Sequence, residues 1–380
     1  MKGDKNIWLL GSSSFFNDVG SEMITPLLPF FIGALGGGGV ALGLLSGLRE
    51  GLSSLLKIFG GWISDRIGKR KIFVFFGYLM SIIFKFFLGI ANTWQQIIAF
   101  VSFERFGKLR DAPRDAIITV STKKRGRGFG LHQMLDTAGG ILGTLFVLFL
   151  FWKFGLSFRT IIFIAAGVSA LSLIPLFFVK EPRMRAIRKS LFKGIKLLDK
   201  RLKYFIFVAA VFTLANFGLY LFLILRARDI TGSIIIPLAL YALFSFVYAL
   251  FAVPFGNLSD KIGRKKVLLI GYVLFLIVSL GFIYLSNLWM LILFFSLYGL
   301  VYAITQSNQR ALVSDLSGEM KGTALGFYYA VIGFVNIPAG VIAGILWDVS
   351  YVTMFTYISA IALLSVIFLL FVREGRGWRR

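Results

Sequence analysis

The sequence contains no cysteine and only one histidine, His132. Without cysteine the chain forms no disulfide, iron–sulfur cluster or cysteine zinc site, and a single histidine excludes a histidine-rich metal site. We therefore expect no metal or cofactor. Charged residues are also scarce, at 15% of the chain, whereas soluble globular proteins have about 25%. A chain with so few charges cannot cover its surface with polar side chains, so its surface is expected to face lipid.

Hydrophobic residues make up 58% of the chain and form about twelve apolar runs, each near the roughly 20 residues that cross a bilayer. We therefore predict an all-α membrane protein with about twelve transmembrane helices. The first run, 7–35, contains Asn17, Asp18 and Glu22. Because it is longer and more polar than the core of a signal peptide, we interpret it as a retained helix.

The formal net charge is +24. Nearly all lysines and arginines fall in alternate loops between the apolar runs, which is the pattern of cytoplasmic loops in membrane proteins. This distribution predicts an inner or plasma membrane location with both termini cytoplasmic. It explains the charge without nucleic-acid binding, which we do not expect.

A charged loop with the pattern Gly-xxx-Asp-Arg/Lys-x-Gly-Lys/Arg occurs at 61–71 and again at 256–266. Both copies lie between apolar runs, about half a chain apart. The repeat predicts two six-helix pseudo-symmetric domains, 1–179 and 204–380, joined by a basic linker, 180–203. The apolar spacing of this linker predicts an amphipathic helix on the anionic inner leaflet, with a solvated linker as the alternative.

The paired loops and the apolar runs resemble the major facilitator superfamily over essentially the whole chain. Two further stretches, 17–29 in the first run and 105–116 in the fourth, look like a group of poorly characterised prokaryotic members. The resemblance implies a rocker-switch carrier with two six-helix domains around a central cavity and a small-molecule substrate. No nucleotide-binding loop and no nucleophile–base set occurs, so we expect neither ATP drive nor enzymatic activity.

The resemblance also implies a conformational latch at the repeated loops. Asp65 would latch onto the start of span 11 and Asp260 would act in the same way towards span 5, although a purely topological anchor is the alternative. The predicted latch residues are Gly61, Asp65, Arg66, Gly68, Lys69, Arg70, Asp115, Gly256, Asp260, Lys261, Gly263, Arg264 and Asp315.

Several charged or ionisable residues lie about ten residues inside the apolar runs of the first half, near the middle of the bilayer. Charges at that depth are costly unless they are paired or hydrated, so they usually face a cavity and carry function. The predicted proton-coupling residues are Asp18, Glu22, Arg49, Glu50, Glu104, Arg105, His132 and Asp136. A static ion-pair network is the alternative, and a packing role is the alternative for His132.

The apolar runs of the second half contain neutral polar residues in place of charges. We predict that these side chains contact the substrate. They are Asn216, Tyr220, Tyr241, Thr305, Gln306, Asn308, Gln309 and Asn336.

The sequence thus predicts a secondary active transporter, and proton-coupled export of small amphipathic molecules is the preferred function. The expected partners are the substrate, protons and membrane lipids, and we expect a monomer. A proton-coupled importer or uniporter of a polar metabolite remains open, because Gly143-Thr144 replaces the Gly-Pro pair often found in antiporters of the superfamily. A non-transporting receptor or a lipid scramblase is the alternative from another class.

Overall fold

The computed structural model describes residues 2–122, 125–181, 195–318 and 320–372, and every regular element in these ranges is a helix. Within these ranges, nine helical segments are long and apolar enough to cross a membrane. The segments 2–34, 39–67 and 94–121 are also long, and they carry Asp18, Glu50 and Glu104 along their length. The charged residues singled out from the sequence are therefore concentrated in the less apolar segments.

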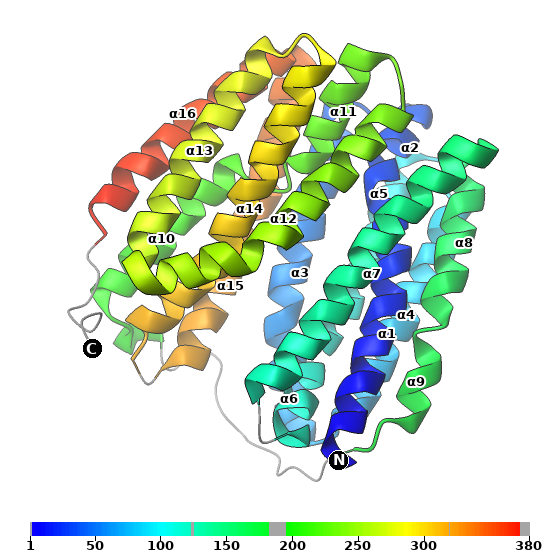
Figure 1. The fold of residues 1–380 in the computed structure, drawn as a ribbon, viewed down its shortest axis with the longest axis vertical. Coiled ribbons are helices and arrows are strands. Elements are labelled where there is room, and N and C mark those ends of the chain that lie inside the picture. Colours follow the sequence, from blue (N-terminus) through cyan, green and yellow to red (C-terminus); the bar gives the residue numbers. More distant parts are fainter. Residues whose placement is uncertain (1, 123–124, 182–194, 319, 373–380) are drawn as a thin grey trace. The chain divides into compact units, whose positions relative to one another are not determined.

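The chain separates into two compact units, one formed by Met1–Gly37 with Leu52–Ser190 and the other by Gly38–Gly51 with Leu191–Arg380. The helices of the first unit are α1 (Lys2–Ile24), η1 (Thr25–Leu27), α2 (Leu28–Ala34), α4 (Lys71–Gly89), α5 (Trp94–Arg105), η2 (Phe106–Arg110), α6 (Asp111–Ser121), α7 (Arg125–Phe154), α8 (Phe158–Ala170) and α9 (Leu173–Phe178) (Figure 1). The long helix α3 (Gly39–Ile67) contributes its first part to the second unit and its remainder to the first.

The helices of the second unit are η3 (Ile195–Leu197), α10 (Lys200–Ala215), α11 (Tyr220–Thr231), α12 (Ile235–Ile262), α13 (Arg264–Tyr284), α14 (Leu288–Leu316), α15 (Lys321–Val349) and α16 (Tyr351–Leu370). Most of the predicted amphipathic linker helix lies outside the described residues. Helix α10 begins at Lys200, inside the predicted linker, because the Asp199 side chain caps it by accepting a hydrogen bond from the Arg201 amide at 2.7 Å.

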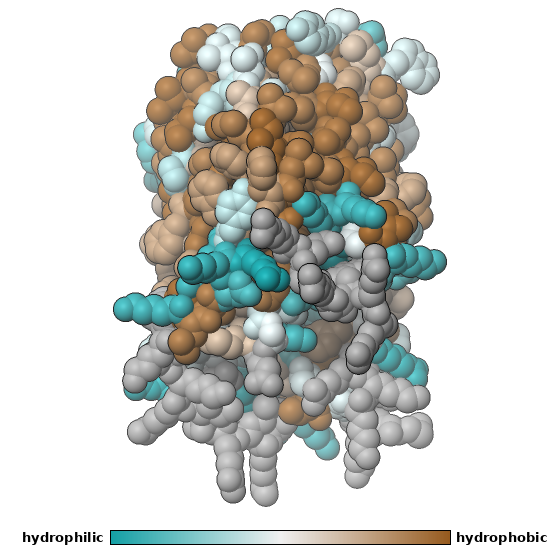
Figure 2. Space-filling view, turned by 90° about the vertical axis from the view of Figure 1, so that its left-hand side faces the viewer, coloured by the Kyte–Doolittle hydropathy of each residue, from teal (hydrophilic) through white to brown (hydrophobic). Residues whose placement is uncertain are grey.

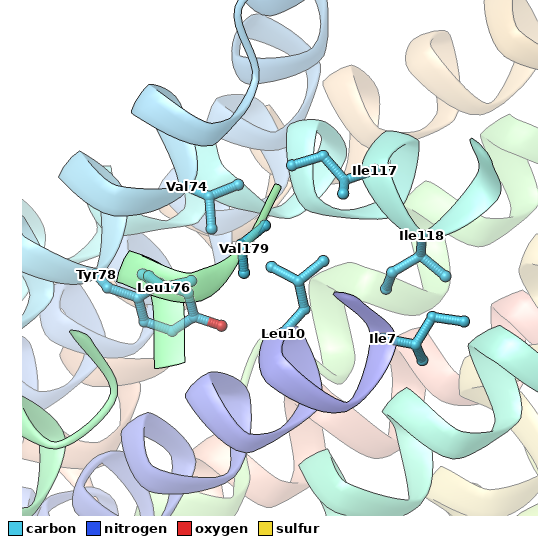
Figure 3. Packing of buried hydrophobic residues seen from close by; sticks show 8 residues of the cluster. All are labelled: Ile7, Leu10, Val74, Tyr78, Ile117, Ile118, Leu176 and Val179. Atoms are coloured by element: carbon cyan, nitrogen blue, oxygen red, sulfur yellow. The ribbon is translucent and has the colours of Figure 1, made fainter. Parts of the chain in front are cut away.

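The core of the first unit contains a cluster of apolar side chains from four helices (Figure 3). Leu10 of α1, Val74 and Tyr78 of α4, Ile117 of α6 and Leu176 of α9 are fully or almost fully buried there. The hydroxyl of Tyr78 also donates to Ser14 Oγ at 3.1 Å. This packing fixes α1 and α4 beside each other, which positions the polar side chains further along both helices.

Large apolar side chains also cover much of the exterior. Figure 2 shows hydrophobic side chains over a broad area of one face, with hydrophilic side chains gathered towards one end of it. Trp289, Val253 and Phe177 are exposed by 81%, 69% and 67%, respectively. Such a surface is stable when it contacts lipid, as the composition predicts.

In the second unit, the first part of α3 packs against α15 along a row of glycines. A Cβ atom at Gly43 would lie 2.0 Å from the carbonyl oxygen of Gly340, and one at Gly344 would lie 2.4 Å from that of Gly39. The two backbones are therefore in direct contact. At the end of this row, Asp348 accepts hydrogen bonds from the amides of Gly39 at 2.6 Å and Val40 at 3.0 Å, which caps α3.

Candidate functional site

Two acidic residues of the first unit lie side chain to side chain: Asp18 of α1 and Asp136 of α7. The two helices run side by side (Figure 1) because glycines of α7 face the α1 backbone. A Cβ atom at Gly139 would lie 2.5 Å from Phe15 O, and one at Gly143 would lie 2.2 Å from Val19 O. Gly139 and Gly143 thus allow the close approach that brings the two carboxyl groups together.

The carboxyl groups of Asp18 and Asp136 lie close to each other and interact across the contact between α1 and α7. Two ionised carboxylates at close range repel each other, so their proximity favours a proton on one of the two groups. Asp18 also accepts from Asn17 Nδ2 at 3.2 Å. Neither aspartate forms an ion pair with any residue that the structure describes. The pair therefore has the chemistry of a proton-holding site.

His132 lies one helical turn before Asp136 on α7. Its side chain is buried, and its Nε2 atom has no hydrogen-bond partner among the described residues. The expected common face of His132 and Asp136 follows from their spacing of four residues. The geometry places an imidazole near the carboxyl pair without a direct hydrogen bond between them.

A buried lysine, Lys85 of α4, joins three helices beside the carboxyl pair. Its Nζ atom donates to Ser169 Oγ at 2.8 Å and to the backbone and side-chain oxygens of Asn17, each at 3.2 Å. Ser81, one turn earlier on α4, donates to Glu104 Oε1 at 2.7 Å. Lys85 is a charge inside a membrane helix, and its partners depend on the packing of α1, α4 and α8.

Glu104 and Arg105 form an ion pair of 2.7 Å at the end of α5. Both side chains are largely buried, and Glu104 connects through Ser81 to the Asn17 and Lys85 cluster. The structure thus brings Asp18, Glu104, Arg105 and Asp136 into the same unit. The arrangement combines a carboxyl pair with a fixed ion-pair network.

Changing Glu104 tests the structural part of this network. Glu104→Ala leaves Arg105 without its carboxylate, and breaking a buried pair in this way typically costs about 3–5 kcal/mol. We expect a large drop in the midpoint of thermal unfolding of the detergent-solubilised protein, and a smaller drop for Glu104→Gln, which keeps a hydrogen-bond acceptor for Ser81. Asp229→Asn, at an exposed carboxylate of α11, is the matched control. Wild-type stability of Glu104→Ala would contradict the network.

The remaining charges of η2 and α6 form a second group that the sequence analysis did not assign. Arg110 is almost fully buried and lies over the Tyr78 ring at 4.2 Å. Asp111 lies 3.8 Å from Arg114 and 3.9 Å from Lys57. The motif Pro113-Arg114-Asp115-Ala116 was the signal for this group, but the sequence does not show that α3 supplies its lysine.

The repeated loops have the same backbone turn in both units. Gly68 has a φ of +74° and Gly263 a φ of +105°, a conformation that favours glycine. Helix α3 meets η2 closely just before the first loop: a Cβ atom at Gly60 would lie 2.1 Å from Leu109 O, whereas one at Gly61 would lie 3.2 Å from the Ala112 side chain. Gly60 therefore makes the tighter contact, and Gly256 has open space around it within the described residues.

The charged latch residues have different partners in the two units. In the first unit, Glu181 accepts from the amides of Arg70 and Lys71, each at 2.8 Å, and so caps α4. Asp115 pairs with its neighbour Arg114 at 3.2 Å. The guanidinium of Arg66 lies 5.3 Å from the Trp62 ring, and Lys69 is exposed. The side chain of Asp65 lies outside the described residues.

In the second unit, Arg264 bridges three helices. Its guanidinium lies 2.6 Å from Asp260 of α12 and 2.9 Å from Asp315 of α14, and it donates to Ser259 Oγ at 2.7 Å. Lys261 is exposed beside it. Arg264 itself begins α13, so this one side chain ties together the ends of α12, α13 and α14.

Two of the predicted proton-coupling residues, Arg49 and Glu50, fall in the part of α3 that belongs to the second unit. Glu50 accepts a hydrogen bond from the Tyr220 hydroxyl at 3.1 Å, and Arg49 is buried. The half-buried Glu22 is in the first unit, where its side chain lies 3.7 Å from the point at which a Gly140 side chain would begin. The predicted group of charges is thus divided between the units.

The predicted substrate residues of the second unit fall into separate groups. Asn216 accepts from Tyr298 OH at 2.7 Å, and the Tyr220 and Tyr241 rings lie 5.9 Å apart. Gln309 donates to Tyr272 OH at 2.9 Å and accepts from Tyr328 OH at 2.8 Å. Thr305, Asn308 and Asn336 hydrogen-bond to carbonyls of their own helices, and Gln306 is exposed. The sequence analysis did not include Tyr272, Tyr298 and Tyr328.

These observations define a class of protein: a multi-pass helical membrane protein in which each of two units buries polar clusters among its helices. The profile of the Major Facilitator Superfamily matches residues 10–240 and 205–380. The chain belongs to this superfamily, and the predicted all-α fold with twelve transmembrane helices is confirmed.

The relatives agree with this assignment. An uncharacterized MFS-type transporter from Methanocaldococcus jannaschii is 51% identical over 97% of this chain and 95% of that protein. The multidrug resistance protein MdtH of Yersinia enterocolitica is 27% identical over 81% of this chain and 78% of that protein. The chain is thus a relative of transporters.

Solved structures share the fold. The nucleoside transporter NupG aligns with a TM-score of 0.78 at 15% identity, covering 98% of this chain and 100% of that chain. The peptide transporter POT in complex with sulfate aligns with a TM-score of 0.78 at 16% identity, covering 98% of this chain and 96% of that chain. At such low identity the likeness concerns the fold alone.

Proposed function

We propose that the protein is a proton-coupled secondary transporter that exports small amphipathic molecules by alternating access. The observation that carries this proposal is the close pair of carboxyl groups of Asp18 and Asp136 on adjacent membrane helices. The pair would hold one proton while the two carboxyl groups are in contact. It would take up or release a proton when the two side chains separate or become hydrated. The similarity to a multidrug resistance protein supports an amphipathic substrate.

In this proposal the protein lies in the inner or plasma membrane with both termini cytoplasmic, and it works as a monomer. The Lys85, Glu104 and Arg105 network would hold α1, α4 and α5 in place while the carboxyl pair changes its protonation. At the repeated loops, the Arg264 bridge to Asp260 and Asp315 would keep three helix ends together as one moving body. The matching loop of the first unit would do the same through the Glu181 cap of α4.

Reconstitution into liposomes tests the function. The protein is placed in proteoliposomes with an imposed pH gradient, and transport of an amphipathic cationic dye is followed together with proton movement by a pH-sensitive fluorophore. We expect dye movement against its gradient, coupled to proton movement in the opposite direction. Dye and protons moving in the same direction would favour the alternative of a proton-coupled importer, and dye movement independent of the pH gradient would favour a uniporter.

A further inference from the structure

The seventh membrane segment of the chain is interrupted. Helix α10 ends at Ala215 and α11 begins at Tyr220, and between them Gly218 has a φ of +90°. An interruption inside a membrane segment frees backbone carbonyl groups, which need a partner because lipid offers none. In other membrane transporters, unwound carbonyls of interrupted helices coordinate the driving cation.

Helix α3 places a serine against this interruption. Ser46 Oγ lies 3.1 Å from Phe217 O and 2.9 Å from Gly218 O. A hydroxyl has one proton, so Ser46 satisfies only one of these two carbonyls at a time. The amide of Leu221 reaches Gly218 O at 3.3 Å, which leaves Phe217 O as the acceptor with the fewest donors. The interruption therefore has more acceptors than donors.

Glu50 brings a carboxylate to the same place. It lies one turn after Ser46 on α3, and both surround Gly218: a Cβ atom there would be 2.6 Å from Ser46 Oγ and 3.2 Å from Glu50 Cγ. The hydrogen bond of Glu50 comes from Tyr220 OH at 3.1 Å, and Glu50 forms no ion pair within the described ranges. A carboxylate inside a membrane protein whose hydrogen bond comes from a neutral phenol needs a counter-charge.

We propose that this cluster binds a monovalent alkali cation, with sodium as the preferred ion. The ligands are the Glu50 carboxylate, the Ser46 hydroxyl, and the backbone carbonyl oxygens of Phe217 and Gly218. All four ligands are oxygens, which suit hard cations. With one negative charge in the set, the site matches a single positive charge, and no group of three or more metal-ligating His, Cys, Asp or Glu side chains occurs among the described residues. Sodium binding here does not depend on the proposed proton pair.

Thermal unfolding of the purified protein tests the site. Melting curves are recorded at constant pH and ionic strength while choline chloride is replaced stepwise by sodium chloride, with potassium chloride as a second series. A cation that binds the folded protein raises the apparent melting temperature by mass action. We expect a saturable rise with sodium and none with choline. Equal curves in sodium and choline would overturn the proposal.

Variants locate the response. Glu50→Gln and Ser46→Ala should each abolish or strongly reduce the sodium-dependent rise, and Asp229→Asn, an exposed carboxylate of α11, should keep it. Asp136→Asn should also keep it, so a failure of the proton proposal and a failure of the sodium proposal can be told apart. An unchanged sodium response in both Glu50→Gln and Ser46→Ala would overturn the proposal. If Glu50→Gln does not fold, the proposal is tested with Ser46→Ala and with the ²³Na NMR linewidth in the presence of wild-type protein. An unbroadened sodium signal would then refute the proposed sodium site.

Discussion

Asp136→Asn is expected to reduce pH-driven transport in proteoliposomes to background. An asparagine side chain can still hydrogen-bond to Asp18, so the packing of α1 against α7 is retained, but the pair no longer has a second carboxyl group with which to exchange a proton. Asp18→Asn should have the same effect, since the two groups act as one titrating pair. The measurement is the initial rate of substrate movement against its gradient, with the imposed pH difference as the drive.

The controls distinguish a loss of proton coupling from a loss of folded protein. Both variants should keep exchange of substrate across the membrane when no pH gradient is applied, and their melting temperatures should stay close to the wild-type value. Asp229→Asn should transport at the wild-type rate. If Asp18→Asn and Asp136→Asn both retained wild-type pH-driven transport, the carboxyl pair would not be the proton carrier.

Gly43→Ala is expected to lower stability strongly in spite of the small size of the added methyl group. The new Cβ atom would lie 2.0 Å from the carbonyl oxygen of Gly340, and a backbone atom cannot turn aside as a side chain can. Forcing extra atoms into a packed region costs typically about 1–3 kcal/mol. The measurement is the midpoint of thermal unfolding in detergent.

Gly326→Ala on the same partner helix α15 is the matched control, because a Cβ atom there meets nothing within 4 Å. Gly340→Ala should resemble Gly43→Ala, and the double variant should lose less stability than the sum of the two, since one displacement of the helices relieves both clashes. Additive losses would mean that the two glycines do not share a contact.

The fold could be predicted because the apolar runs and the repeated loops are local signals. Gly68 and Gly263 stand at the same place of the two copies, and both have the backbone turn that only glycine adopts easily. The beginning of α10 was less predictable. The basic composition of 180–203 indicated a linker, whereas the cap at Asp199 starts the helix at Lys200 inside it.

The candidate site could be predicted only in part. Spacing along a helix gives depth, which is why Asp18 and Asp136 could be singled out from the sequence. It does not give the neighbour across a helix interface, so the partners of Lys85 in α1 and α8 were missed. Glu50 shows the same limit, because the sequence groups it with the first half of the chain, whereas its hydrogen bond goes to Tyr220 of the second unit.

The row of glycines along which α3 packs against α15 has a mechanical consequence. Because main-chain atoms touch there and glycines have no side chains to reorder, the surfaces can come apart and meet again without selecting among rotamers. The two hydrogen bonds from Gly39 and Val40 to Asp348 at the end of this contact have to be exchanged for water. Such a helix contact opens at little entropic cost and closes into a single register. Repeated conformational cycles of the proposed transporter require both.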